Sequence, residues 1–237
     1  MNAVENRFQQ GLRDGIPIGL GYLSVSFTFG MMAVNAGIPV HIAVLISLTN
    51  VTSAGQFSGL ALILQQGSLI ELALSQFVIN LRYALMSLSL TQKVDHQMKT
   101  YQRAMLAYGI TDEIFALASS TYERVGKNYM YGLLFFPILC WTLGTLIGGV
   151  ASTLMPEAIR NALGIAIYGM FLAIIIPPAK KFSSVRNVLI LSILLSCIFQ
   201  AIHTYVPISS GFVIIICTLV AAGFGAYFFP VEEVTHE

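Results

Sequence analysis

Arg82 is the side chain in this 237-residue sequence that most needs a chemical explanation. It lies about halfway along the apolar segment 71–91, in which Glu71 is the only other charged residue. A guanidinium stays protonated in proteins, and at the centre of a membrane-spanning helix it costs at least about 2.5 kcal/mol. It therefore needs a carboxylate, several carbonyl groups or a water-filled cavity. Because Asp112 and Glu113 are the other acids deep in an apolar context, we predict that Arg82 pairs with Asp112.

Two interpretations of this pair stay open: a fixed ion pair that joins two elements, and a site that binds or gates a charged solute. A zwitterionic amino acid needs N–H donors for its carboxylate, which an arginine or a helix N-terminus supplies, and an acid or free carbonyls for its ammonium. Gln56 would add polar contacts. An aliphatic side chain would need a dry pocket, for which the candidates are Phe57, Ile114 and Phe115. The same groups would suit another small polar solute.

The composition places these residues in a membrane. Hydrophobic residues make up 56% of the chain and charged residues only 10%, with a formal net charge of +1, whereas soluble domains carry about a quarter charged residues. A lipid bilayer must therefore surround most of the chain. The balanced charge gives no reason to expect a nucleic-acid partner. The three cysteines lack metal-ligand spacing, and no nucleotide-binding or catalytic motif occurs, so we expect no metal, no cofactor and no enzymatic activity.

Uncharged runs define the expected spans, since about 20 apolar residues in a helix cross a bilayer. We predict an all-α integral membrane protein with six or seven transmembrane helices. Residues 1–14 form a cytoplasmic or interfacial N-terminal segment, 15–229 a single transmembrane domain, and 230–237 a short acidic tail. The later spans are expected at 129–153, 161–178, 187–205 and 211–229.

The basic loops 92–103 and 180–186 should both be cytoplasmic. If every apolar segment crossed the membrane fully, these loops would lie on opposite sides. The conflict disappears if the segments around Gln56 and Asp112 are re-entrant or broken helices, each entering and leaving by one face. The N-terminus, both basic loops and the C-terminus then all lie in the cytoplasm.

Local sequence supports two breaks. Residues 49–59 are polar, β-branched and glycine-containing, with Gly55 and Gly59, and residues 107–115 contain Gly109 and Thr111. Thr111 or Asp112 would cap a helix that begins there. Irregular backbone at membrane depth survives where it is buried in protein or lines a cavity, and two such breaks in corresponding halves, as in inverted repeats, indicate a transporter's substrate site. The alternative is a kinked span and a surface hairpin.

Helical periodicity separates the faces of segment 71–91. One arc is apolar and should face lipid; it comprises Leu74, Phe77, Val78, Leu81, Leu85 and Leu88. Two polar stripes should face the helix bundle: Gln76, Asn80, Tyr83 and Ser87 form the first, and Ser75, Arg82 and Ser89 the second. The spacings Gly15-x-x-x-Gly19, Gly55-x-x-x-Gly59 and Gly144-x-x-x-Gly148 predict close helix contacts.

An ordered set of motifs resembles a known family. The motifs are Pro17-Ile18-Gly19-Leu20-Gly21-Tyr22, Ala54-Gly55-Gln56-Phe57, Asn80-Leu81-Arg82-Tyr83, and Gly109-Ile110-Thr111-Asp112-Glu113-Ile114-Phe115. Over roughly its first 180 residues the chain resembles the AzlC-type family, the large subunit of bacterial branched-chain amino-acid exporters. Tyr83 departs from the histidine that is common in the family, which bears on the substrate.

The resemblance implies a multi-pass exporter in the bacterial plasma (inner) membrane for valine, leucine and isoleucine, with methionine as a wider option. It also implies a small hydrophobic membrane subunit of the AzlD type as partner. The family's functional positions map onto Gln56, Asn80, Arg82 and Asp112. The leading hypothesis is a secondary transporter in which Asp112 or Glu113 takes up the coupling proton; the alternative is a passive channel or a structural membrane subunit for another small polar solute.

Overall fold

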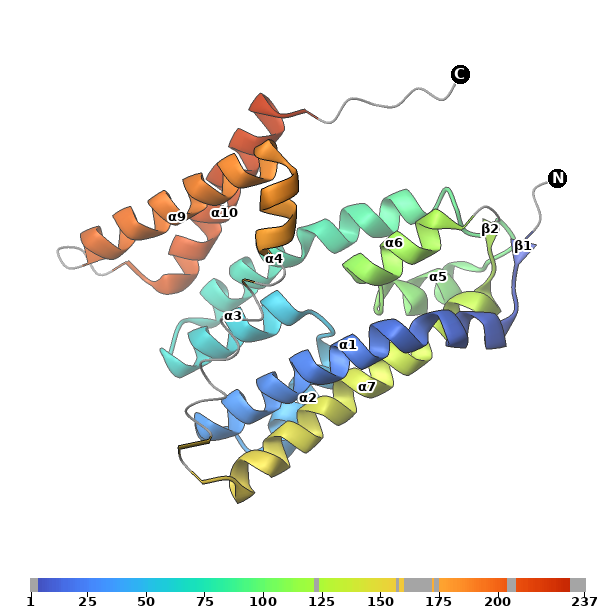
Figure 1. Ribbon diagram of the computed structural model, residues 1–237, viewed down its shortest axis with the longest axis horizontal. Helices are drawn as coiled ribbons and strands as arrows, with labels where there is room; N and C mark the ends of the chain where they lie inside the picture. The colour runs from blue at the N-terminus through green and yellow to red at the C-terminus, as the bar shows by residue number, and fades with distance from the viewer. Residues whose placement is uncertain are drawn as a thin grey trace. The chain divides into compact units, whose positions relative to one another are not determined.

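The computed structural model describes residues 4–121, 124–156, 158–159, 172, 175–203 and 208–230. The chain divides into two compact units (Figure 1): Met1–Phe57 with Asn80–Ile167, and Ser58–Ile79 with Tyr168–Glu237. Each unit is described by itself. The span predicted at 161–178 lies almost wholly outside the described residues, as does the acidic tail after Pro230.

The first unit is built on two long helices, α1 (Phe8–Asn35) and α7 (Lys127–Leu154), which lie side by side (Figure 1). Glycines let their backbones approach closely, because no side chain separates them. A Cβ atom at Gly15 would lie 2.6 Å from the carbonyl oxygen of Leu133, and one at Gly148 would lie 2.0 Å from that of Phe27. The close contact predicted from the glycine spacing in both segments is confirmed.

Helices α2 (Val40–Thr49) and α3 (Ser53–Leu64) follow, separated by an interruption at Asn50, Val51 and Thr52. The interruption is narrower than the polar stretch 49–59, because Gly55 and Gly59 already lie within α3. A Cβ atom at Gly59 would lie 3.3 Å from Nε2 of Gln76, so this glycine is a close-approach position in the second unit rather than irregular backbone.

The second interruption separates α5 (Thr100–Ala107) from α6 (Asp112–Ser120). Thr111 is the N-cap of α6, and its side chain accepts a hydrogen bond from the backbone N–H of Ile114. The sequence left Thr111 and Asp112 as alternatives, and the structure has Thr111 in the capping role. Two short strands, β1 (Val4–Glu5) and β2 (Arg124–Val125), pair in parallel just before the starts of α1 and α7.

The core of the first unit lies among the end of α4 (Leu69–Leu90), α5, α6 and the start of α7. The apolar side chains that meet there come from successive elements of the chain, and their packing fixes α6 and its N-terminus against α7. The buried members of this cluster are Leu90, Val94, Met98, Leu106, Ile110, Ile114, Ala118, Val125, Tyr129, Met130, Leu133 and Leu134.

Helix α4 exposes the face that the sequence predicts to meet lipid. Five of the six side chains of its apolar arc are exposed: Leu74, Phe77, Leu81, Leu85 and Leu88. The first polar stripe is half-buried throughout. The prediction that the second stripe faces the bundle is wrong for two of its members, because only Ser75 is buried whereas Arg82 and Ser89 are exposed. Arg82 has its ionic partner at this surface, described below.

In the second unit, α9 (Ser183–His203) packs along α10 (Ser210–Phe228). Five described helices are long and apolar enough to cross a membrane: α1, α4, α7, α9 and α10. This is the architecture of an all-α, multi-pass membrane protein. Because the predicted span 161–178 falls outside the described residues, the count of six or seven spans stays a prediction.

Candidate functional site

A salt bridge joins α4 to α6 in the first unit. Nη1 of Arg82 lies 2.7 Å from Oδ2 of Asp112, and the two side chains are 43% and 42% exposed. Nη2 of Arg82 donates to the hydroxyl of Tyr83 at 2.9 Å, and the guanidinium lies 4.7 Å from the centroid of that ring. The pairing predicted from the cost of an unpaired arginine is therefore present, and its role in binding a solute stays a prediction.

The start of α6 is suited to negative charge. Asp112 and Glu113 occupy its first turn, where the unpaired backbone N–H groups and the helix dipole stabilise anions. Gly109 in the preceding turn packs closely on α7, since a Cβ atom there would lie 2.7 Å from Cδ2 of Leu134, whose side chain would have to move. The helix therefore begins at a place set by its cap at Thr111 and by contact with α7.

The two interruptions of the helices are in contact. The hydroxyl of Tyr108, in the turn between α5 and α6, donates to the backbone carbonyl oxygen of Leu48, near the end of α2. Carbonyl groups in the last turn of a helix lack intrahelical partners, and this contact satisfies one of them. Two segments about 60 positions apart thus come together where each helix is broken.

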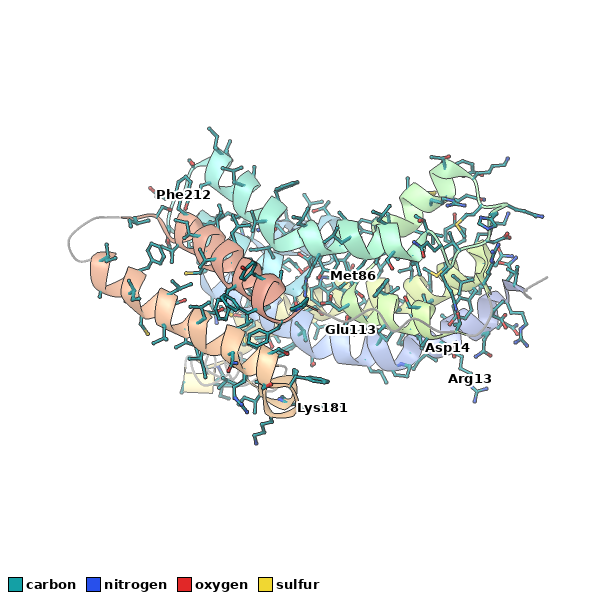
Figure 2. All side chains as sticks on the ribbon, turned by 90° about the horizontal axis from the view of Figure 1, so that it is seen from above. Arg13, Asp14, Met86, Glu113, Lys181 and Phe212 are labelled. Atoms are coloured by element: carbon teal, nitrogen blue, oxygen red, sulfur yellow. The ribbon has the colours of Figure 1, made fainter. Side chains whose placement is uncertain are left out.

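Tyr22 connects α1 to the beginning of α6. Its hydroxyl lies 2.5 Å from Oγ1 of Thr111 and 2.6 Å from Oε2 of Glu113. Figure 2 labels Glu113 on α6. The ring of Tyr22 is buried and packs edge-on against Trp141, with 5.2 Å between ring centroids. One tyrosine thus holds both the cap of α6 and a carboxylate of its first turn.

A chain of hydrogen bonds runs through the interior from α3 to α7. Nε2 of Gln56 donates to Oγ of Ser47 at 2.7 Å, the hydroxyls of Ser47 and Thr145 are 2.6 Å apart, and Thr145 donates to the carbonyl of Trp141 at 3.2 Å. Gln56 is only 1% exposed. Within the described part of the chain, its Oε1 and the Nε1 of Trp141 have no hydrogen-bond partner.

An unpaired buried acceptor costs roughly 1–3 kcal/mol. The Oε1 atom of Gln56 is therefore a position where a ligand N–H group or a water molecule would be stabilised.

The hydrogen-bond chain and the charged cluster also meet along α1, because Oγ of Ser26 donates to the carbonyl of Tyr22 at 2.8 Å and Thr145 approaches the carbonyl of Ser26.

The structure groups some predicted residues and separates others. Arg82, Asp112 and Glu113 belong to one cluster, and Gln56 to the hydrogen-bond chain. Phe57 lies next to Gln56 on α3 and packs edge-on against Phe29 at 5.6 Å between ring centroids. Asn80 is half-buried on α4, two residues before Arg82. Ile114, a candidate for a dry pocket, is instead part of the packed core of the first unit.

Sequence reasoning missed several polar residues of these clusters: Tyr22, Ser26, Ser47 and Thr145. Each lies in a mainly apolar helix that also carries other hydroxyl side chains, such as Thr28 in α1 and Thr49 in α2, and such hydroxyls are too common to signal a site. Tyr22 lies within a motif of the family resemblance, and that motif was the one available signal. Glu71 was noted as a charge, but not as the buried group that the structure shows; it is 4% exposed, and Oε1 accepts from the N–H of Gly211 at 2.8 Å and from the hydroxyl of Ser209.

Comparison with known proteins gives the family context. A family described as "AzlC protein" matches residues 17–155. An inner membrane protein named YgaZ from Escherichia coli is 28% identical over 184 residues, covering 75% of each chain. An uncharacterized membrane protein from Archaeoglobus fulgidus is 30% identical over 175 residues, covering 73% of this chain and 76% of its own. No solved structure matches the chain.

Proposed function

Because the chain belongs to the AzlC family, we propose that it is a secondary transporter that exports branched-chain amino acids across the bacterial plasma membrane. The observation that carries the proposal is the salt bridge between Arg82 and Asp112 at the start of α6, beside the contact that joins the two helix interruptions. The chain would act as the large subunit of a two-subunit complex, with no chemical conversion of its solute.

The pair has the charges that an amino acid requires. Arg82 would bind the substrate carboxylate through its fork of N–H donors, helped by the N-terminus of α6, and Asp112 would bind the ammonium. A zwitterion that enters between them replaces one ion pair by two, so neither side chain loses its ionic partner. In the empty state the two side chains neutralise each other, which explains how both are tolerated in a membrane protein.

The polar residues around the pair would complete the site. Gln56 offers an unpaired, buried acceptor to a substrate N–H group, with Phe57 next to it as an apolar contact for an aliphatic side chain. Asn80 lies on α4 close in sequence to Arg82. The substrate range proposed is valine, leucine and isoleucine, with methionine as an extension; it rests on the family resemblance.

We assign proton coupling to Asp112 or Glu113. Binding of the substrate ammonium to Asp112 requires the ionised carboxylate, so a proton at that position and a substrate compete. Glu113 is exposed and hydrogen-bonded to Tyr22, an arrangement in which a proton taken up by the acid would change a contact between α1 and α6. Substrate binding and proton binding would thus act on the same end of α6.

The topology proposed has two re-entrant or broken segments, α2–α3 and α5–α6, among six or seven spans. The contact between Tyr108 and the carbonyl of Leu48 supports a common depth for the two interruptions. This topology places the basic loops 92–103 and 180–186 on the cytoplasmic side. The same proposal includes an inverted-repeat relation between the two halves of the chain.

A small hydrophobic subunit of the AzlD type is the proposed partner. The exposure of about two-fifths of each side chain in the Arg82–Asp112 pair supports it, since a charged pair is not stable against hydrocarbon and needs water or protein around it. A second chain beside α4 would exclude lipid from the pair while leaving a path for the solute.

Counterflow tests the proposed function. Vesicles that contain both subunits are loaded with labelled valine, and its exit is measured with and without unlabelled valine outside. A carrier with an alternating site should release the label faster when external valine is present, and vesicles with an unrelated amino acid such as lysine outside serve as control. Exit at one rate under all conditions would indicate a channel, and the absence of valine movement would refute the proposal.

A further inference from the structure

An apolar cavity of about 410 Å³ opens in the first unit, and neither Arg82 nor Asp112 lines it. Its wall is formed by the last turns of α4, the loop that follows, α5, and Met130 of α7. Most of the lining side chains are aliphatic, among them Leu88, Val94 and Leu106. Pockets that bind small molecules fall in the range of about 300–1,000 Å³ and are mainly apolar with a few polar groups.

Arg103 is the charged residue of this wall. Two backbone carbonyls fix its guanidinium: Nε donates to Met98 at 3.1 Å and Nη2 to Asp95 at 3.3 Å. Among the described residues, Arg103 has no carboxylate within salt-bridge distance. The guanidinium therefore keeps N–H donors and a positive charge available at a wall that is otherwise apolar.

These features define the chemistry of a ligand. It must carry a negative group for Arg103 and a long apolar body for the rest of the cavity. A zwitterionic amino acid fits poorly, because no acidic side chain lines the described wall to meet its ammonium. An amphiphile with one anionic end satisfies both requirements.

The position of the cavity indicates where such an amphiphile comes from. It lies at the end of α4, a helix of membrane-spanning length whose side chains Leu85 and Leu88 are exposed. The following segment carries Lys93 and Lys99 as well as Arg103. Basic pockets at the cytoplasmic ends of membrane helices favour anionic lipid headgroups, whose phosphates attract arginine and lysine.

We propose that this cavity binds an anionic phospholipid, with one acyl chain among the aliphatic side chains and the phosphate at Arg103. The lipid would join the end of α4 to α5, two elements of the unit that holds the Arg82–Asp112 pair. The inference does not depend on the proposed substrate, and lipid binding is measured without transport.

Native mass spectrometry of the full chain, with its small subunit where the two copurify, tests the proposal. Phosphatidylglycerol and phosphatidylcholine with identical acyl chains are added in equal amounts. We expect the wild type to retain phosphatidylglycerol about fivefold better, the factor expected for one basic residue near an anionic headgroup. Arg103→Ala should reduce this ratio to near one.

Two further variants make the result specific. Arg13→Ala is the matched control, because Arg13 is exposed on α1 and extends away from the helices (Figure 2); it should keep the wild-type preference. Ala104→Phe fills the cavity from an exposed position of α5 and leaves Arg103 intact, so it should reduce retention of both lipids.

If Arg103→Ala does not fold, Ala104→Phe decides the outcome. Equal retention of the two lipids by the wild type, or unchanged binding to Ala104→Phe, would overturn the proposal.

Discussion

Replacing Gly30 by alanine tests whether close packing of α1 on α7 supports the site. A Cβ atom at Gly30 would lie 2.1 Å from the carbonyl oxygen of Thr145 and 2.9 Å from the N atom of Gly149. Both contacts are with helix backbone, which cannot rotate away as a flexible side chain would. The two helices must therefore separate locally at Thr145, whose side chain is hydrogen-bonded to Ser47.

Gly21→Ala is the matched control in the same helix, because no atom lies within 4 Å of a Cβ at that position. Both substitutions gain the helix propensity of alanine, about 1 kcal/mol. That gain cancels in the comparison, and the difference is the cost of overpacking, about 1–3 kcal/mol. For a chain of this size, 1 kcal/mol corresponds to a shift of about 2–4 °C in Tm. Gly30→Ala should therefore melt about 2–12 °C below Gly21→Ala.

Thermal unfolding of the purified protein in detergent, followed by circular dichroism at 222 nm, measures the difference. A second expected effect is functional: Gly30→Ala should reduce valine efflux at a temperature at which it is still folded, because the Ser47–Thr145 contact is displaced, whereas Gly21→Ala should not. Equal Tm values for the two variants would refute the packing described for α1 and α7.

Three other substitutions test single contacts. Gln56→Leu should change the free energy of unfolding by no more than about 1.5 kcal/mol, the worth of its one hydrogen bond, yet should reduce valine efflux strongly; efflux at the wild-type rate would remove Gln56 from the site. Tyr22→Phe should lower Tm and efflux through the lost contacts with Thr111 and Glu113, while the fluorescence of Trp141, the one tryptophan of the chain, stays unchanged because the ring packing is kept. Glu71→Gln should destabilise by about 1–3 kcal/mol, since the buried carboxylate accepts from the start of α10; a Tm equal to that of the wild type would contradict the role of Glu71.

Several features of the site were predictable because a strong physical cost acts on one residue. An arginine within an apolar segment needs an anion, which was enough to predict the pairing of Arg82 with Asp112. A threonine before two acids is a common helix start, which predicted the start of α6 with Thr111 or Asp112 as its cap, and the structure has Thr111 in that role. The apolar arc of α4 follows directly from helical periodicity and does not depend on what the other helices do.

The missed features depend on how distant helices align. Ser47 and Thr145 become partners because α2 and α7 meet at one level. Each helix carries more than one hydroxyl side chain, so the sequence does not predict which of them meet. Glu71 is buried because the start of α10, 140 residues later, supplies its donors. Ile114 was expected near a substrate, but the direction of α6 turns it into the core, and helix direction is set by packing against α7.

Valine efflux from cells loaded with a valine-containing dipeptide tests most directly whether Arg82 and Asp112 form the transport site. Arg82→Ala and Asp112→Asn, expressed with the small subunit at wild-type levels, should each lower the efflux rate at least about tenfold, since each loses a charge-assisted contact of about 1.5–3 kcal/mol with the solute. Arg13→Ala should export valine normally. Normal efflux from either of the two site variants would contradict the account.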